Sequence, residues 1–226
     1  MRTVLVTGGT RGIGREIVRA LAPTTRVIVG GRDAAAVAAV VAEHPGASGF
    51  VADLGDPDAV ARAVAGLGER LDAVVHSAGV VSHGRADELS WDEWRRVLDL
   101  NVIAVAELTR LLLPRLRAAR GQVVVLNSGA GFTAGPGSAI YAASKFAVRA
   151  WTDALRAEER GVLRVTSVHP GRVDTDMQRE LQAAEGRADY DTSQVMTAAA
   201  VAGAVAFALD APADACVETV SVRPAG

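Results

Sequence analysis

The chain has 226 residues, of which half are apolar and 22% are charged, so it can bury a sizeable core. Its net charge of −2 gives no electrostatic reason to expect nucleic acid or an anionic membrane as a partner. The single cysteine, Cys216, cannot form an internal disulfide, and the apolar run from Met196 to Leu209 is too short to cross a bilayer. With no linker or repeat to divide the chain, we predict one cytoplasmic domain over residues 1–226.

Short β-branched runs alternate with longer helix-like stretches along nearly the whole chain. The predicted strands, in chain order, are Thr3–Thr7, Arg26–Val29, Gly49–Ala52, Ala73–His76, Gln122–Asn127, Arg164–His169 and Val217–Val222. The helices between them are predicted near residues 12–22, 33–43, 56–69, 90–117, 138–160 and 195–209. Several strands are apolar throughout, as in a parallel sheet covered by helices on both faces. The order predicts a doubly wound, Rossmann-like α/β fold.

One predicted helix carries signals for its start and its end, and one segment has no clear periodicity. Ser90 and Glu93 form a capping-box pattern that predicts a helix start, whereas Pro114 predicts a kink or an early end of that helix. Residues 176–194 are polar and charged, so they are predicted to be irregular. That segment is either an ordinary surface loop or a lid over the functional site.

A glycine-rich segment, Thr7-Gly8-Gly9-Thr10-Arg11-Gly12-Ile13-Gly14, joins the first predicted strand to the first helix. Glycines there allow a tight turn and let the backbone approach a pyrophosphate, while the helix N-terminus offers free N–H groups to the phosphates. Glycines alone are a weak signal, but their place in the first strand-to-helix turn favours dinucleotide binding.

The end of the second predicted strand indicates which dinucleotide is bound. An acidic residue there would bind the ribose 2′-hydroxyl of NAD, and an arginine would accept the 2′-phosphate of NADP. The chain has Arg32 at this point, with Arg11 of the glycine-rich turn as a second partner. We interpret Asp33 as the N-cap of the next helix rather than as a ribose ligand. NADP(H) is therefore predicted in preference to NAD(H).

Only one of the 24 basic residues is a lysine, and this residue, Lys145, lies four positions after Tyr141. In a helix that spacing places both side chains on one face. A neighbouring cation lowers the pKa of a phenol, which would make Tyr141 usable as an acid or base near neutral pH. Arginine cannot replace a compact ammonium at such a place, which accounts for the lysine.

The glycine-rich turn, the Tyr141-x-x-x-Lys145 pair, Ser128 and Asn101 together resemble the short-chain dehydrogenase/reductase family, in its compact single-domain form. The resemblance implies a seven-stranded parallel sheet in the order 3-2-1-4-5-6-7. It implies that Tyr141 protonates the substrate oxygen and that Ser128 hydrogen-bonds the carbonyl. Lys145 would bind the nicotinamide ribose and lower the Tyr141 pKa, and Asn101 would hold a water that links Lys145 to solvent.

The resemblance also implies further cofactor contacts. Asp53 corresponds to a residue that binds the adenine amino group, and Thr175 to one whose hydroxyl reaches the phosphate or the carboxamide. The family's Asn-Asn-Ala-Gly segment is His76-Ser77-Ala78-Gly79 here, and Val222–Gly226 replaces the usual Asp-Gly-Gly ending. The candidate cofactor-binding residues are Gly8, Thr10, Arg11, Gly12, Ile13, Gly14, Arg32, Asp53, Leu54, Ser77, Ala78, Gly79, Tyr141, Lys145, Pro170, Gly171, Val173 and Thr175.

The predicted reaction is hydride transfer that reduces a ketone or aldehyde to an alcohol, or the reverse. One alternative is a non-catalytic NADP(H)-sensing protein, which would be expected to have lost one of Asn101, Ser128, Tyr141 and Lys145. The other is a nucleotide-independent lyase or dehalogenase, which usually lacks the glycine-rich turn. The complete set of motifs favours the oxidoreductase.

The substrate is a small molecule that the sequence does not choose, because the fold serves many substrates. Phe132 and Met177 are candidates for the substrate pocket, and His83 could border it. The four histidines lack metal-ligand spacing, so no metal is predicted. The resemblance suggests a homodimer or homotetramer that forms through the helices near 90–117 and 138–160.

Overall fold

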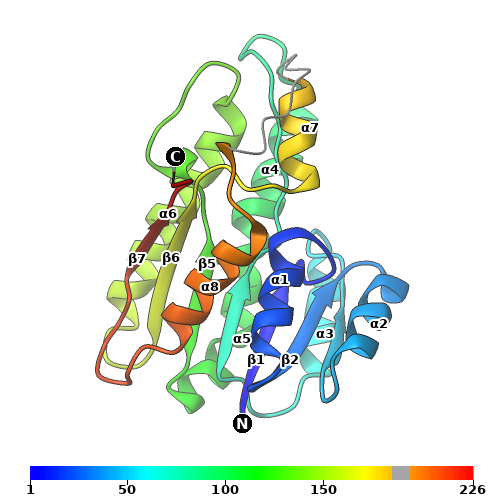
Figure 1. The fold of residues 1–226 in the computed structure, drawn as a ribbon, viewed down its shortest axis with the longest axis vertical. Helices are drawn as coiled ribbons and strands as arrows, with labels where there is room; N and C mark the ends of the chain where they lie inside the picture. The colour runs from blue at the N-terminus through cyan, green and yellow to red at the C-terminus, as the bar shows by residue number, and fades with distance from the viewer. Residues whose placement is uncertain (185–193, 226) are drawn as a thin grey trace.

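The computed structural model describes residues 1–184 and 194–225. Its centre is a parallel sheet of seven strands in the order β3-β2-β1-β4-β5-β6-β7 (Figure 1). The strands are β1 (Arg2–Thr7), β2 (Thr25–Gly31), β3 (Ser48–Val51), β4 (Ala73–His76), β5 (Gln122–Leu126), β6 (Arg164–Pro170) and β7 (Thr219–Val222). The predicted fold class and strand order are confirmed.

Helices connect the strands and cover both faces of the sheet. The α-helices are α1 (Gly12–Leu21), α2 (Ala34–Glu43), α3 (Pro57–Ala65), α4 (Trp91–Leu98), α5 (Ala104–Ala119), α6 (Ala139–Glu158), α7 (Asp176–Ala184) and α8 (Ala198–Leu209). In Figure 1, α1 and α8 lie in front of the sheet, and α3 and α5 lie behind it. None of the described helices is both long and apolar enough to cross a membrane.

Successive side chains of the central strands point to opposite faces of the sheet, so each strand contributes to both hydrophobic cores. Val4 and Val6 of β1 belong to the core beneath α1, α2 and α8, whereas Leu5 belongs to the core beneath α3, α5 and α6. All three side chains are buried. A strand that packs helices on both faces therefore has no polar face, which is why its sequence does not alternate.

The predicted helix over residues 90–117 is interrupted, but the interruption does not lie at Pro114. The Ser90–Glu93 capping box is present and begins α4. A π-helical turn, η1 (Asp99–Ile103), separates α4 from α5, and α5 continues through Pro114 to Ala119. The predicted early end is therefore wrong. One lost backbone hydrogen bond is tolerated here because buried leucines, Leu112 and Leu116, fix the helix against the core.

The segment predicted to be irregular, residues 176–194, begins as a helix, so that prediction is wrong for α7. The Thr175 hydroxyl accepts a hydrogen bond from the Gln178 backbone N–H at 3.3 Å and caps the first turn. Because α7 lies beyond the carboxyl ends of the strands (Figure 1), the helix borders the predicted site. Residues 185–193 of the same segment lie outside the described part of the chain.

Candidate active site

The carboxyl ends of the strands meet at one edge of the sheet, where a cavity of about 550 Å³ opens. Its lining brings together segments far apart in the sequence, from the turn after β1 to the start of α7. The predicted residues that line it are Gly8, Thr10, Arg11, Gly12, Ile13, Gly14, Arg32, Asp53, Leu54, Ser77, Ala78, Gly79, Tyr141, Lys145, Pro170 and Thr175.

The glycine-rich turn is shaped by the absence of side chains. Gly8 has a φ of +65°, a conformation that residues with a Cβ rarely adopt. A Cβ on Gly14 would lie 2.1 Å from the Gly8 carbonyl oxygen, so the first turn of α1 can pack against Gly8 only because residue 14 is glycine. The resulting surface lets a ligand approach the backbone at the N-terminus of α1.

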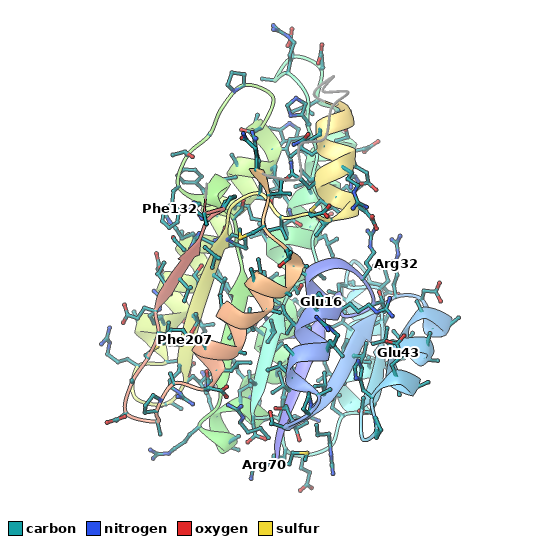
Figure 2. The ribbon with its side chains drawn as sticks, in the orientation of Figure 1. Glu16, Arg32, Glu43, Arg70, Phe132 and Phe207 are labelled. Atoms are coloured by element: carbon teal, nitrogen blue, oxygen red, sulfur yellow. The ribbon has the colours of Figure 1, made fainter. Side chains whose placement is uncertain are left out.

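Near the end of the second strand, two arginine side chains line the cavity, and an aspartate side chain caps the next helix. Arg32 and Arg11 are exposed and line the cavity, and Figure 2 shows Arg32 beyond the end of β2 nearest α7. Asp33 accepts hydrogen bonds from the backbone N–H groups of Ala35 at 2.8 Å and Ala36 at 3.2 Å. The carboxylate therefore caps α2, as the sequence predicted.

The loop after β4 is tied to the glycine-rich turn by one hydroxyl. Thr7 accepts hydrogen bonds from the backbone N–H groups of Ser77 at 3.0 Å and Ala78 at 3.1 Å. A Cβ on Gly79 would lie 3.1 Å from the Asn101 side-chain oxygen, so residue 79 must be small. Sequence reasoning missed the role of Thr7, although its place just before the first glycine was visible.

Lys145 is buried on α6, and its ammonium donates a hydrogen bond to the Leu126 carbonyl at 3.0 Å. Its Nζ lies 5.6 Å from the centre of the Tyr141 ring, so the predicted shared helix face is confirmed. Burial lowers the pKa of Lys145 to about 8, because desolvation disfavours the charged form. The ammonium is still mostly protonated at neutral pH.

The pKa of Tyr141 is raised, mainly because burial disfavours the phenolate, and a hydrogen bond with Ser128 opposes the shift. The expectation of a lowered pKa is therefore wrong for the ligand-free protein. Desolvation outweighs the hydrogen bond with Ser128, and the extent of burial is not visible in the sequence spacing. The direction leaves a protonated phenol at neutral pH, which is the form of a general acid.

Asn101 and Ser128 are not among the described residues that line the cavity. Asn101 is buried, whereas Ser128 is only partly buried and hydrogen-bonds the lining residue Tyr141. The Asn101 amide nitrogen donates to the Val80 carbonyl at 2.9 Å and to the Ser144 hydroxyl at 3.1 Å, and its oxygen accepts from the Val80 N–H at 2.9 Å. This buried side chain therefore fixes the loop after β4 against α6. The π-helical turn that contains Asn101 resembles the single-turn bulges frequent at functional sites.

The predicted nicotinamide-side turn divides into two parts. Pro170 and Thr175 line the cavity, whereas Gly171 and Val173 are outside its described lining. The Gly171 N–H donates to the Val222 carbonyl at 2.7 Å, and Val173 bridges to Met196. These two residues therefore hold the turn in place through neighbouring segments.

Several cavity-lining residues were not predicted from the sequence. Asn127, next to Ser128, lines the cavity, and its buried amide nitrogen has no hydrogen-bond partner among the described residues. Other lining residues that were missed are Gly30, Gly31, Phe50, Ala52, Val80, Leu100, Leu126 and Asp176. Most are small or apolar residues that no chemical motif distinguishes from core residues.

Of the remaining residues that the sequence singled out, one lines the cavity and the others pack against neighbouring segments. Met177 lines the cavity, whereas Phe132 stacks on His169 with ring centres 4.2 Å apart. The His83 ring packs on Gly137, where a Cβ would lie 2.2 Å from His83 Cε1. His76 bonds to the Thr109 hydroxyl at 2.8 Å inside the core. The described residues contain no group of three or more His, Cys, Asp or Glu side chains that could hold a metal ion.

Comparison with known proteins agrees with this geometry. The family model described as short chain dehydrogenase matches residues 2–186. An uncharacterized short-chain type dehydrogenase/reductase of Sinorhizobium fredii is 33% identical, with 98% of this chain and 91% of that protein covered. L-fucose dehydrogenase of Bos taurus is 35% identical over 80% of this chain and 70% of its own length.

Solved structures are similar over almost the entire chain. The closed form of serine dehydrogenase complexed with NADP+ has a TM-score of 0.91 at 27% identity and covers 98% of this chain and 94% of its own. A putative NAD(P)-dependent gluconate 5-dehydrogenase from Beutenbergia cavernae with bound NADP has a TM-score of 0.87 at 31% identity, covering 99% and 95%. The chain belongs to the short-chain dehydrogenase/reductase family of oxidoreductases.

Proposed function

We propose that the protein is an NADP(H)-dependent oxidoreductase that interconverts a carbonyl compound and an alcohol, with Tyr141 as the general acid and base. The observation that carries the proposal is that Tyr141 and Lys145 of α6 line the same cavity as the glycine-rich turn. Nucleotide binding and acid–base chemistry would then occur in one place. This juxtaposition favours the oxidoreductase over the sensor and the lyase.

Two features of the cavity support the binding of a dinucleotide. Gly8 and Gly14 keep side chains out of the turn after β1, and the buried amide nitrogen of Asn127 has no partner within the described part of the chain. NADPH would supply the hydride for carbonyl reduction. The protein's part is to place donors at the carbonyl oxygen, where negative charge develops.

The proton-transfer chemistry is assigned to three side chains. In the reducing direction Tyr141, protonated at neutral pH, donates its proton to the developing alkoxide, and Ser128 donates a hydrogen bond to the same oxygen. Lys145 would bind the nicotinamide ribose, and its charge would stabilise the tyrosinate that remains. Asn101 would hold α6 and the loop after β4 in register.

NADP(H) is proposed over NAD(H) because Arg11 and Arg32 line the cavity; Asp33 lines it as well, but its Oδ1 atom accepts the hydrogen bonds that cap α2. Exposed guanidinium groups bind a 2′-phosphate, whereas NAD requires a free carboxylate near the ribose. The NADP-bound serine dehydrogenase and gluconate 5-dehydrogenase neighbours support the same choice. The substrate is proposed to be a small carbonyl compound or alcohol.

We also propose that the protein acts in the cytoplasm as a homodimer or homotetramer. Trp91 and Ile103, on the helical path predicted to contact other copies, are 75% and 58% exposed. Large apolar side chains at such exposure favour burial against a partner. Light scattering coupled to size exclusion tests this, and a strictly monomeric protein at micromolar concentration would contradict it.

The function is tested with Tyr141→Phe. We expect kcat for a carbonyl substrate, identified by screening a panel with NADPH absorbance, to fall roughly 1,000-fold because no acid remains. NADPH affinity, followed by protein fluorescence, should change by less than about threefold, since the ring is kept. Near-normal turnover would refute the mechanism, and absence of nucleotide binding by the unmodified protein would favour the lyase.

Lys145→Arg is the companion variant that keeps the charge. The ammonium lies in a buried position beside the Leu126 carbonyl, and a wider guanidinium does not fit there. We expect kcat to fall roughly 100-fold, which corresponds to about 2.7 kcal/mol of transition-state stabilisation. A fully active variant would show that charge alone suffices at this position.

A further inference from the structure

The loop that carries Ser128 accepts hydrogen bonds from side chains of two other parts of the chain. We call residues 128–132 the serine loop; its middle forms a short 3₁₀ turn, η2 (Gly129–Gly131). Arg149 of α6 donates a hydrogen bond to the Gly131 carbonyl at 2.8 Å. His169 of β6 bonds to the Ser128 carbonyl at 3.0 Å through its Nδ1 atom. The loop is therefore fixed from outside as well as by its own turn, in which the Gly131 N–H donates to the same Ser128 carbonyl at 3.0 Å.

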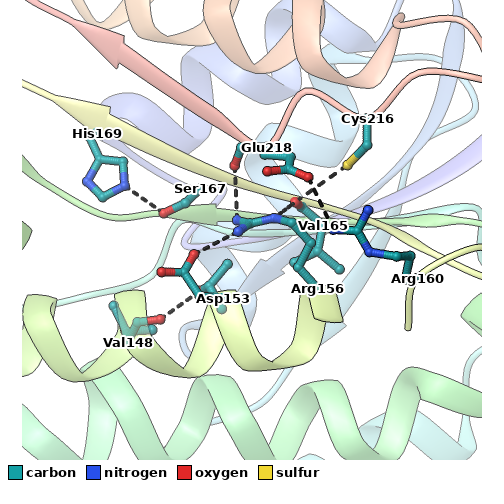
Figure 3. A network of polar contacts seen from close by, with 10 residues as sticks. Val148, Asp153, Arg156, Arg160, Val165, Ser167, His169, Cys216 and Glu218 are labelled. Atoms are coloured by element: carbon teal, nitrogen blue, oxygen red, sulfur yellow. Dashed lines mark hydrogen bonds and ion pairs between the residues drawn. The ribbon is translucent and has the colours of Figure 1, made fainter. Parts of the chain in front are cut away.

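The His169 bond defines how the imidazole is protonated. A carbonyl oxygen can only accept, so Nδ1 must carry the proton that is donated to Ser128. The other nitrogen, Nε2, then accepts from the Ser167 hydroxyl at 2.8 Å, a contact drawn in Figure 3. Both ring nitrogens have a hydrogen-bond partner in the neutral form, and the ring packs against Phe132 with the two ring planes tilted by 37°.

The charges around His169 favour that neutral form. Burial lowers the pKa of His169, and the guanidinium groups of Arg149 and Arg223 lower it further. The bond to the Ser128 carbonyl and the carboxylate of Asp153 oppose the shift. At neutral pH the ring is therefore an uncharged donor toward the serine loop.

The segment after β7 contacts the backbone of His169. Arg223 donates hydrogen bonds to the His169 carbonyl at 2.5 Å and to the Val222 carbonyl at 3.0 Å. The Arg223 guanidinium also reaches the serine loop, because a Cβ on Gly129 would lie 3.5 Å from one of its nitrogens. The C-terminal segment that departs from the usual ending is thus in contact with both His169 and the serine loop.

We propose that His169 is a positioning residue that holds Ser128 in the orientation needed to bond the substrate oxygen, with Arg223 fixing the strand end that carries His169. The proposal rests on the proposed role of Ser128. The Ser128 hydroxyl oxygen accepts a hydrogen bond from the Ala130 N–H at 3.1 Å, and the position of the hydroxyl follows the backbone that His169 holds. Misplacement of about 1 Å in such a group costs up to 100-fold in rate.

The tautomer gives a test that needs no substrate. In protein labelled with ¹⁵N-histidine, two-bond ¹⁵N–¹H spectra at pH 7.5 distinguish the two neutral tautomers, and the signal missing from His169→Asn assigns residue 169. We expect the proton on Nδ1, which agrees with donation to the Ser128 carbonyl. A proton on Nε2 alone would overturn the proposal.

A double-mutant cycle tests positioning in catalysis. His169→Leu removes the donor, and we expect kcat to fall about tenfold with little change in NADPH affinity. His169→Asn, whose amide nitrogen can replace Nδ1, should recover most of the loss. Ser167→Ala, which leaves the bond to Ser128 in place, is the matched control and should lose less than about twofold.

The decisive comparison is made in a Ser128→Ala background, with thermal melting recorded for every variant. There, His169→Leu should cause no further loss, because residues that act through one group are not additive. The same tenfold loss in both backgrounds would overturn the positioning role, as would failure of His169→Asn to recover activity. Wild-type turnover by Ser128→Ala would instead refute the proposed function itself, whatever the tautomer shows.

Discussion

The two halves of the cavity are built on opposite principles. The nucleotide half, formed by β1–β3 with α1 and α2, depends on missing side chains at Gly8 and Gly14 and on exposed arginines. The catalytic half, formed by β4–β6 with α5 and α6, depends on buried polar side chains such as Asn101 and Lys145, each hydrogen-bonded. The first half is therefore sensitive to added volume, and the second to lost hydrogen bonds and to charge.

Added volume is tested most strongly at Gly14. We expect Gly14→Ala to destabilise the protein by about 3 kcal/mol and to weaken NADPH binding at least roughly 100-fold, because the new Cβ meets the backbone of Gly8. Urea unfolding and fluorescence titration measure the two effects. Gly203→Ala in α8 is the matched control, since a Cβ there meets no described atom within 4 Å outside its own helix, and the change should stabilise the protein by about 1 kcal/mol. Equal effects of the two variants would remove the steric argument.

Buried polar groups are tested at His76, whose pKa burial lowers to about 4. The unfolded chain binds a proton near pH 6.5 and the folded protein does not, so stability is lost as pH falls from 6.5 towards 4, by about 3 kcal/mol in full. His76→Gln can still donate to Thr109 but cannot be protonated, so the loss between pH 7 and pH 4.5 should shrink by about 2.5 kcal/mol.

Urea unfolding at the two pH values checks the His76 prediction. An unchanged pH dependence in His76→Gln would show that the core accepts the imidazolium without penalty.

The exposed arginines should give the smallest effect. We expect Arg32→Asp to weaken NADPH binding roughly tenfold and to leave NADH binding within about threefold, because the lost contact is to the 2′-phosphate and is screened by solvent. Arg26→Asp makes the same change in charge at the other end of β2 and should alter neither affinity. Unchanged NADPH affinity in Arg32→Asp would refute the phosphate assignment.

The sequence predicted the nucleotide half more completely than the catalytic half. Gly14, which packs on Gly8, and Asp33, which caps α2, act on residues a few positions away in the chain, so their spacing indicates their roles. The pairing of Lys145 with Tyr141 could also be predicted from spacing, because both residues lie on one helix. Thr7 and Asn127 were missed because their partners, or the absence of partners, depend on loops far away in the sequence.

By itself the sequence determined the α/β order, the parallel sheet, the glycine-rich turn and the Tyr141–Lys145 face, because periodicity and short spacings are local. Only the tertiary structure decided the π-helical turn at Asn101, the helical start of 176–194, the raised pKa of Tyr141 and the contacts of Ser128 with His169. Each of these reflects a balance between local preference and packing or desolvation by distant segments. That balance has no signature in spacing, since its partners come together only when the chain folds.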